Sequence, residues 1–377
     1  MSPEHERRLR VAVDAAPLLG QRTGVGHVTG GIVAGLATRD DVEVQAYVVT
    51  RRGRRDLGGV LPAGARAATS WMPARAVHRL WERWAWPTIE RWTGAVDVVH
   101  ATNFVAPPAR APVVASVYDL AFARFPELCR PETARLEPLL RRALDRGATV
   151  HTVSDHVAEE VREHFDVPAE RVVRIYTGIA ADATGDAGAG RRLAGSDRYV
   201  LALGTVEPRK NLPTLVRAFD HVAEHDRDVG LVVAGPDGWG VEAYRAAVDE
   251  ARHADRIHRL GYVSDGERAD LLAGAAALAY PSLYEGFGHP PLEAMAAGVP
   301  VVTARAGSLP EAVGDAALLV DPHDGEELAD ALARVLSDDA LRADLVARGR
   351  RRAAMFTWPP AIDELVALYR RLAAGAR

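Results

Sequence analysis

Cysteine and long apolar runs are both scarce in this chain of 377 residues. Its one cysteine, Cys129, excludes an internal disulfide framework and a four-cysteine zinc site. No run of about eighteen apolar residues occurs, so no membrane-spanning helix is expected. Residues 1–8 are charged and unlike a secretory signal peptide. These absences predict a protein of the reducing cytoplasm.

Signature motifs of several enzyme classes are also missing. The chain has no H-E-x-x-H zinc pair, no G-x-S-x-G nucleophile elbow and no G-x-x-x-x-G-K-[ST] phosphate loop. Its D-x-D triplet, Asp226-Arg227-Asp228, precedes a predicted strand, which favours a solvated turn over a metal site. We therefore expect no metal and no cofactor. A net charge of −5 argues against nucleic acid as the main partner.

What the chain does contain is a regular alternation of short apolar strands and helices in both halves. This alternation predicts parallel βαβ units, and the length exceeds that of one typical core. The predicted fold is α/β, with two doubly wound, Rossmann-like domains facing a cleft. The expected bounds are 1–180 for the N-terminal domain, 181–197 for a linker, 198–355 for the C-terminal domain and 356–377 for a last helix that crosses back.

A glycine-rich stretch, residues 20–30, follows the first predicted strand. It resembles a phosphate-cradling loop, but Gly24, Gly26 and Gly30 have the spacing G-x-G-x-x-x-G, which differs from the dinucleotide fingerprint. The stretch also begins several residues beyond the strand. A plain long loop and a ligand-binding loop both fit this pattern.

Five of the seven tryptophans fall within residues 71–92. They alternate with arginines; the residues are Trp71, Arg75, Arg79, Trp81, Arg83, Trp84, Trp86, Arg91 and Trp92. One interpretation is an amphipathic helix that rests on an anionic membrane or a lipid-linked acceptor, which would make the protein peripheral at the inner face of the membrane. The alternative is a helix that packs its aromatics on its own domain. The break at Pro87 favours the second.

Polar residues end two predicted strands of the first half. His100 follows one strand, and Tyr118 and Asp119 follow the next. Side chains at the carboxyl ends of strands line the binding crevice of an open α/β sheet. A buried structural histidine remains an alternative for His100. We take His100, Tyr118 and Asp119 as candidates for the acceptor side of a site.

The first strand of the second half ends at Gly204 and is followed by Glu207-Pro208-Arg209-Lys210-Asn211. Arg209 and Lys210 are therefore expected at the mouth of a crevice, just before a helix begins. A guanidinium and an ammonium next to backbone N–H groups suit a diphosphate. The alternative is a surface pair of basic residues, although positive charge at a helix start is mildly unfavourable.

Residues 281–295 predict a strand end, a glycine loop and a helix N-terminus, with Glu285 in the loop and Glu293 in the first turn of the helix. The two glutamates could form an acid–base pair, accept sugar hydroxyls or interact with the helix dipole. A carboxylate can accept two hydroxyls at once, so a vicinal diol is a natural partner.

These patterns resemble those of the group 1 (family 4) retaining glycosyltransferases, which have the two-domain GT-B fold. The most specific parts are E-P-R-K-N at 207–211 and E-x7-E at 285–293. The resemblance covers nearly the whole chain. Four shorter motifs also agree with the family in order and spacing: Gly24-x-Gly26, Ser154-Asp155, Gly298-Val299-Pro300-Val301-Val302 and Phe356-Thr357-Trp358.

The resemblance implies roles for the candidate residues. Arg209 and Lys210 would bind the donor diphosphate, and Glu293 would hold the ribose hydroxyls. Glu285 would contact the transferred sugar together with the backbone of Gly286, Phe287 and Gly288. The donor-side set is completed by Gly24, Gly26 and Gly204, and the residues taken as catalytic are Arg209, Lys210, Glu285 and Asp119. Many relatives have His-Asp at the position of Tyr118-Asp119, so no histidine role carries over there.

The amino-acid sequences of these motifs are most similar to those of mannosyltransferases of polysaccharide assembly. The expected reaction moves a hexose, with mannose favoured, from GDP-mannose or another nucleotide-diphosphate sugar to a glycan, lipid-linked or small-molecule acceptor. The family retains the donor's α-anomeric configuration. Two alternatives are a nucleotide-sugar epimerase of the same fold and a non-catalytic, membrane-associated scaffold.

Overall fold

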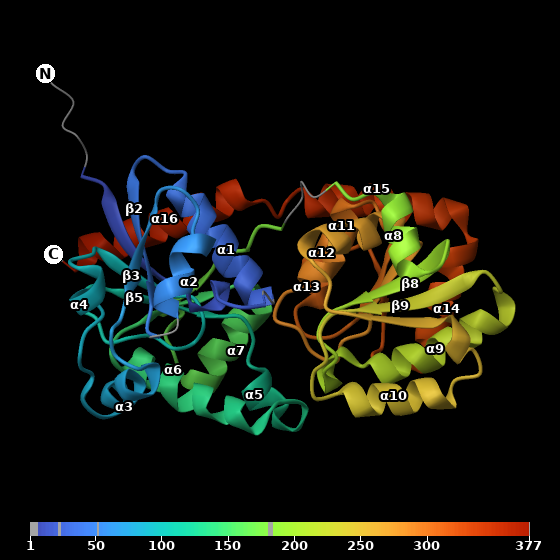
Figure 1. Cartoon of the computed structure of the whole chain (residues 1–377), viewed down its shortest axis with the longest axis horizontal. Helices are drawn as coiled ribbons and strands as arrows, with labels where there is room; N and C mark the ends of the chain where they lie inside the picture. Colours follow the sequence, from blue (N-terminus) through green and yellow to red (C-terminus); the bar gives the residue numbers. More distant parts are fainter. Residues whose placement is uncertain (1–6, 22–23, 51–52, 180–183, 377) are drawn as a thin grey trace, which may run out of the picture. The chain divides into compact units, whose positions relative to one another are not determined.

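The computed structural model describes all residues except 1–6, 22–23, 51–52, 180–183 and 377. The chain forms two compact units (Figure 1). The first comprises Met1–Ala123, Glu132–Gly178 and Trp358–Arg377, and the second comprises Arg124–Pro131 and Ile179–Thr357. The chain therefore enters the second unit twice.

The first unit is built on a seven-stranded sheet in which all paired strands are parallel. Its order is β3-β2-β1-β4-β5-β6-β7. The strands are β1 (Leu9–Asp14), β2 (Val42–Val48), β3 (Ala65–Thr69), β4 (Val98–Ala101), β5 (Val113–Val117), β6 (Thr149–Thr152) and β7 (Val172–Arg174). Strand order reverses direction between β1 and β4, which is where such sheets place their crevice.

Helices connect these strands. They are α1 (Gly24–Ala37), α2 (Gly53–Val60), α3 (Ala74–Trp84), α4 (Glu90–Thr93), α5 (Ala121–Arg124), α6 (Leu136–Asp145), α7 (Asp155–Phe165) and the C-terminal α16 (Trp358–Gly375). Ser154 caps α7 by accepting a hydrogen bond from the N–H of Val157 and so begins the helix.

The second unit has a six-stranded parallel sheet in the order β10-β9-β8-β11-β12-β13. Its strands are β8 (Arg198–Leu203), β9 (Val229–Ala234), β10 (Ile257–Gly261), β11 (Ala277–Tyr280), β12 (Val301–Ala304) and β13 (Leu318–Val320). The order reverses between β8 and β11, so loops after these two strands flank the crevice of this sheet.

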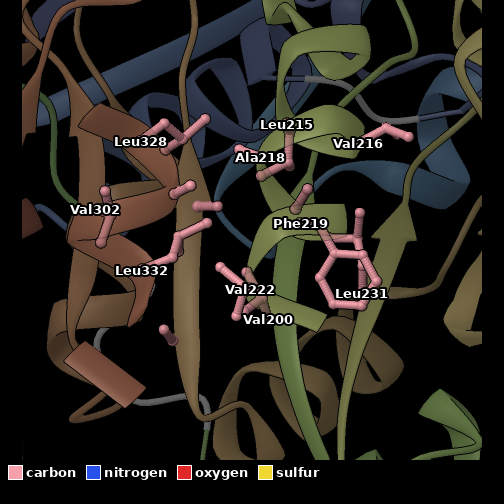
Figure 2. Packing of buried hydrophobic residues seen from close by; sticks show 14 of the residues in the cluster. Val200, Leu215, Val216, Ala218, Phe219, Val222, Leu231, Val302, Leu328 and Leu332 are labelled. Carbon is pink, nitrogen blue, oxygen red and sulfur yellow. The ribbon is translucent and has the colours of Figure 1, made fainter. Parts of the chain in front are cut away.

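The helices of the second unit cover this sheet. They are α8 (Ala187–Ala194), α9 (Leu212–His225), α10 (Val241–Glu250), α11 (Asp265–Gly274), α12 (His289–Ala296), α13 (Leu309–Val313), α14 (Gly325–Ser337) and α15 (Asp339–Ala353). Figure 2 shows Phe219 of α9 and Leu332 of α14 among the side chains of the core. Both are fully buried, and burial of one such side chain contributes about 1.5–3 kcal/mol.

The stretch predicted as a linker, 181–197, contains helix α8, and this part of the prediction is wrong. Asp186 accepts hydrogen bonds from the N–H groups of Gly188 and Ala189 and so begins the helix. Gly190 then allows close packing on α11, since a Cβ there would lie 1.9 Å from the carbonyl oxygen of Asp270. A helix that packs through glycine lacks the apolar periodicity that would have predicted it.

The glycine stretch of the first unit also differs from its prediction. Helix α1 begins at Gly24, so Gly24 and Gly26 lie in its first turn and not in a long loop. A Cβ on Gly31 would lie 1.9 Å from the Trp358 ring, and one on Gly35 would lie 2.4 Å from Ile362. Two glycines of α1 therefore allow α16 to pack closely on it.

We expect Gly31→Leu to lower the stability of the first unit by about 1–3 kcal/mol, because the added side chain overlaps Trp358. Gly58→Leu on α2 is the matched control, since a Cβ at Gly58 meets no atom within 4 Å. Differential scanning calorimetry should give a lower Tm for Gly31→Leu alone. Equal Tm values for the two variants would contradict this packing role.

Candidate functional site

Two glycines directly follow strands β8 and β9 of the second unit. Gly204 (φ +142°) and Gly235 (φ +138°) have backbone conformations that favour glycine. A Cβ on Gly235 would lie 2.1 Å from the carbonyl oxygen of Gly204, and one on Gly204 would lie 3.3 Å from Cε of Lys210. Gly204 thus leaves room for the Lys210 side chain, which is a packing reason for a predicted donor-side residue.

Residues 208–210 form a short 3₁₀ turn that is fixed to the loop after β11. The Asn211 side-chain amide donates to the carbonyl oxygens of Pro281, at 3.1 Å, and Pro322, at 2.7 Å. The N–H of Leu283 donates to the carbonyl oxygen of Arg209 at 2.8 Å. These bonds join the two loops that flank the strand-order reversal.

Arg209, Lys210 and Glu285 meet at this point. The Arg209 guanidinium lies 2.7 Å from Oε2 of Glu285, and the Lys210 ammonium lies 2.5 Å from Oε1. Lys210 also donates to the Tyr280 hydroxyl at 2.7 Å, and Arg209 pairs with Glu207 at 2.6 Å. Sequence motifs that lie about 75 residues apart therefore form one charged cluster.

The cluster is nearly buried, and its electrostatics follow from that. Burial works to raise the pKa of Glu285, but the charges of Arg209 and Lys210 outweigh it and lower that pKa to about 2. Burial and the neighbouring Arg209 lower the pKa of Lys210. Glu207 and Glu285 together balance the two cations, so a phosphate would bind here by taking over part of their pairing with Arg209 and Lys210.

Lys210 is the only lysine of the chain, in which lysine and arginine together number 46. The remaining residues in that count are arginines, so an ammonium side chain occurs at this one position. An ammonium is a compact charge, whereas a guanidinium is a wide planar fork. The space bounded by Gly204, Tyr280 and Glu285 accepts the compact group.

Ser308 fixes the backbone of the glycine loop, residues 285–288. Its hydroxyl donates to the carbonyl oxygens of Glu285, at 2.9 Å, and Phe287, at 3.0 Å. The Phe287 ring is buried between the rings of His289 and Phe356. The side chain of Phe287 thus belongs to the core, which leaves the backbone of this loop as the predicted contact.

Glu293 lies in the second turn of α12, because the helix begins at His289. The prediction that it lies in the first turn is wrong, and so a simple interaction with the helix dipole does not explain it. Its carboxylate forms an ion pair with Arg268 of α11. Burial raises the pKa of Glu293 against the opposing charge of Arg268. No local pattern in the sequence points to Arg268.

A segment from the first half of the chain completes the surroundings of this loop. Within Arg124–Pro131, the Phe125 ring lies 5.2 Å from the Tyr284 ring, next to Glu285. Trp239 donates to the carbonyl oxygen of Leu128 at 3.0 Å, and the Arg130 guanidinium lies over the Trp239 ring. The sequence contains no signal for this long-range packing.

In the first unit, His100 is fully buried in a chain of hydrogen bonds. His151 must donate from Nε2 to the carbonyl oxygen of Ile175, so its Nδ1 accepts from Ser116. Ser116 then accepts from Nε2 of His100, whose Nδ1 accepts from the Tyr369 hydroxyl at 2.6 Å. Both nitrogens of His100 are occupied, so the structure favours the structural alternative over contact with an acceptor.

The other predicted residues of the first unit lie at the carboxyl ends of its strands. Tyr118 is buried, and burial raises the pKa of its hydroxyl. Asp119 is partly exposed and accepts a hydrogen bond from the N–H of Ala121, which begins α5. Asp14, which the sequence did not indicate, ends β1 at the strand-order reversal, and burial raises its pKa to about 6. Asp119 and Asp14 are the carboxylates of this edge that remain candidates.

The described residues contain no group of three or more His, Cys, Asp or Glu side chains placed to hold a metal ion. Among the same residues, no helix is both long and apolar enough to cross a membrane.

Comparison with known proteins shows the family of the chain. Residues 189–352 match the family described as glycosyl transferases group 1, and residues 22–183 match glycosyltransferase family 4. The O-antigen chain mannosyltransferase B of Escherichia coli is 33% identical over 283 residues, which cover 73% of this chain and 74% of that protein. A D-inositol 3-phosphate glycosyltransferase of Actinosynnema mirum is 31% identical over 372 residues, which cover 92% and 81%.

The fold is also similar to solved structures. Sucrose-phosphate synthase from Thermosynechococcus elongatus superposes with a TM-score of 0.78 at 20% identity, covering 98% of this chain and all of that one. The chain, with its two parallel, doubly wound sheets, therefore has the GT-B fold. On its sequence matches along both halves, the chain belongs to the group 1 glycosyltransferases and is a transferase enzyme.

Proposed function

We propose that this enzyme transfers a hexose, with mannose favoured, from a nucleotide-diphosphate sugar to a glycan, lipid-linked or small-molecule acceptor and retains the anomeric configuration. The observation that carries the proposal is the nearly buried cluster of Arg209, Lys210 and Glu285 at the strand-order reversal. The similarity to a mannosyltransferase of O-antigen chains supports mannose as the sugar. GDP-mannose is the donor that the motifs of the sequence favour.

In the proposed reaction, the bond between the anomeric carbon and the donor phosphate breaks, and the nucleoside diphosphate leaves with the electron pair. Negative charge develops on the departing phosphate oxygen. Arg209 and Lys210 stabilise that charge, and preorganised charges of this kind are a major source of catalysis. The acceptor oxygen bonds to the same face of the anomeric carbon, and its proton passes to the departing phosphate.

Glu285 has a second role in this proposal. Without donor it pairs with both cations, at 2.7 Å from Arg209 and 2.5 Å from Lys210, while Glu207 pairs with Arg209 at 2.6 Å. When the diphosphate takes over part of that pairing, carboxylate lone pairs become available to hydroxyls of the transferred sugar. Glu293, oriented by Arg268, holds the ribose hydroxyls in the same way.

A thermal-shift panel of GDP, UDP, dTDP and ADP tests the donor. A ligand at a hundred times its Kd stabilises the folded state by about 2.7 kcal/mol, so the matching nucleotide raises Tm most. The proposal expects GDP to give the largest shift and GDP-mannose to yield α-linked product with a mannose oligosaccharide as acceptor. A sugar converted without any acceptor would support an epimerase, and vesicle binding without nucleotide binding would support a scaffold.

We expect Glu293→Gln to weaken GDP binding by about ten- to a hundredfold, because hydrogen bonds to a charged group contribute about 1.5–3 kcal/mol. Glu242→Gln is a suitable control, since its side chain is 82% exposed on α10. Isothermal titration calorimetry gives both Kd values. An unchanged Kd for Glu293→Gln would remove this residue from the donor site.

A further inference from the structure

Three large aromatic side chains are exposed in residues 71–92 of the first unit. Trp71 is 62% exposed, Trp84 is 64% exposed and Trp86 is 56% exposed. In the same stretch, Trp81 is buried and donates to the carbonyl oxygen of Pro87 at 2.7 Å, and Trp92 packs against the core. Two tryptophans therefore fix this segment to its unit, and three leave their indoles in water.

Helix α3 carries a row of arginines on the side away from the core. Val77 and Trp81, four residues apart, are buried and define its inner face. Arg75, Arg79 and Arg83 are spaced in the same way, about half a turn around the helix, and are exposed. In the sequence, Trp71 precedes this row, while Trp84 and Trp86 follow it. Figure 1 labels α3 in the first unit. Exposed indoles thus lie at both ends of a basic face about 12 Å long.

The segment is positive within a chain whose net charge is −5. Residues 71–92 contain four arginines and two glutamates, Glu82 and Glu90. Glu90 accepts hydrogen bonds from the backbone N–H groups of Arg110 and Ala111, so its carboxylate is used in contacts within the first unit. The surface is therefore complementary to an anionic partner.

The distribution of these groups decides between partners. A second copy of the chain that met this face symmetrically would oppose its arginine rows to each other, which is unfavourable. At a membrane surface, tryptophan is enriched at the level of the headgroups, and arginine is attracted to anionic lipids. Indoles at the ends of a basic face suit that environment.

We propose that residues 71–92 dock the first unit on an anionic phospholipid bilayer, with Trp71, Trp84 and Trp86 inserted at headgroup level and the arginines of α3 against lipid phosphates. The docking needs neither donor nor acceptor, so it is independent of the proposed transfer reaction. It is a peripheral contact that weakens as salt screens the arginines.

Sedimentation of the full chain with large unilamellar vesicles tests this proposal. One set contains phosphatidylcholine alone, and the other contains phosphatidylcholine with phosphatidylglycerol. We expect binding to the second set, at least about tenfold weaker binding to the first, and loss of binding at high salt. Equal binding to both sets, or no binding to either, would overturn the proposal.

Two sets of variants locate the contact. The triple variant Trp71→Ala, Trp84→Ala, Trp86→Ala and the triple variant Arg75→Glu, Arg79→Glu, Arg83→Glu should each lower the bound fraction at least about tenfold. The charge-matched control is Arg227→Glu, Arg334→Glu, Arg351→Glu, three exposed arginines of the second unit, which should bind as wild type does. Circular dichroism and GDP thermal shift report folding in every variant. Wild-type binding by either test variant, or an equal loss in the control, would overturn the assignment.

Discussion

Lys210→Ala is expected to lower kcat by on the order of a hundredfold or more. Removing one group that stabilises transition-state charge typically has an effect of this size. The Lys210 ammonium lies in a nearly closed space between the Tyr280 hydroxyl and the Glu285 carboxylate, so water cannot replace it at low cost. Initial rates with GDP-mannose at saturating donor measure the effect.

Lys210→Arg separates charge from shape. Arginine keeps the positive charge, but its wider fork must fit where a Cβ on Gly204 would already lie 3.3 Å from Cε of Lys210. We therefore expect this variant to be impaired by at least about tenfold as well. Arg227→Ala, at an exposed position of the same unit, is the control for substitution of a basic residue. Near-normal turnover of Lys210→Ala would contradict the phosphate role.

The second large effect concerns the acid stability of the second unit. The pKa of Glu285 is about 2 in the folded protein, below its ordinary value of 4.5, because Arg209 and Lys210 outweigh the effect of burial. A lowered pKa stabilises the folded state above the ordinary value, and this contribution is lost as pH falls from about 4.5 to about 2. The shift corresponds to about 3 kcal/mol.

Calorimetric unfolding between about pH 5 and pH 2 measures this contribution. The free energy of unfolding of wild type should fall with pH more steeply than that of Glu285→Gln, which lacks the titrating group. Glu242→Gln removes an exposed carboxylate and should keep the wild-type slope. Parallel curves for wild type and Glu285→Gln would show that the ion pairs do not hold Glu285 ionised.

The parts of the molecule that local patterns determine could be predicted from the sequence. The alternation of parallel strands with helices in both halves, and the strand ends that precede Gly204 and residues 281–295, are observed as expected. Parallel strands have their carboxyl ends at one edge of the sheet, so the sequence places residues 204–211 and 281–295 at the same edge. That they are neighbours there follows from the observed pairing of β8 with β11.

The parts that depend on long-range packing could not be predicted in this way. Helix α8 is held by close backbone contact through Gly190, which leaves no apolar period. The ion pair of Glu293 with Arg268 and the packing of Phe125 on Tyr284 join residues with no local relationship. His100, predicted to follow a strand, lies within β4, and Ser116 and Tyr369 on other elements occupy both its nitrogens.

The exposed and buried tryptophans of residues 71–92 show why neither interpretation of that pattern was complete. Trp81 packs inward, as the alternative of a packed helix predicts. Trp84, only three residues later at the helix end, is 64% exposed, as a surface contact requires. The periodicity of a helix predicts its inner face but not the orientation of side chains at its ends.

The single lysine allows a direct test of the central claim that the Lys210 ammonium binds the donor diphosphate. Protein grown with lysine labelled with ¹³C at Cε gives one lysine Cε signal, that of Lys210. Titration with GDP should shift this signal with the same Kd that the thermal-shift curve gives, and guanosine, which lacks phosphates, should not shift it. A Cε signal that stays in place while GDP binds would contradict the assignment of Lys210 to the diphosphate.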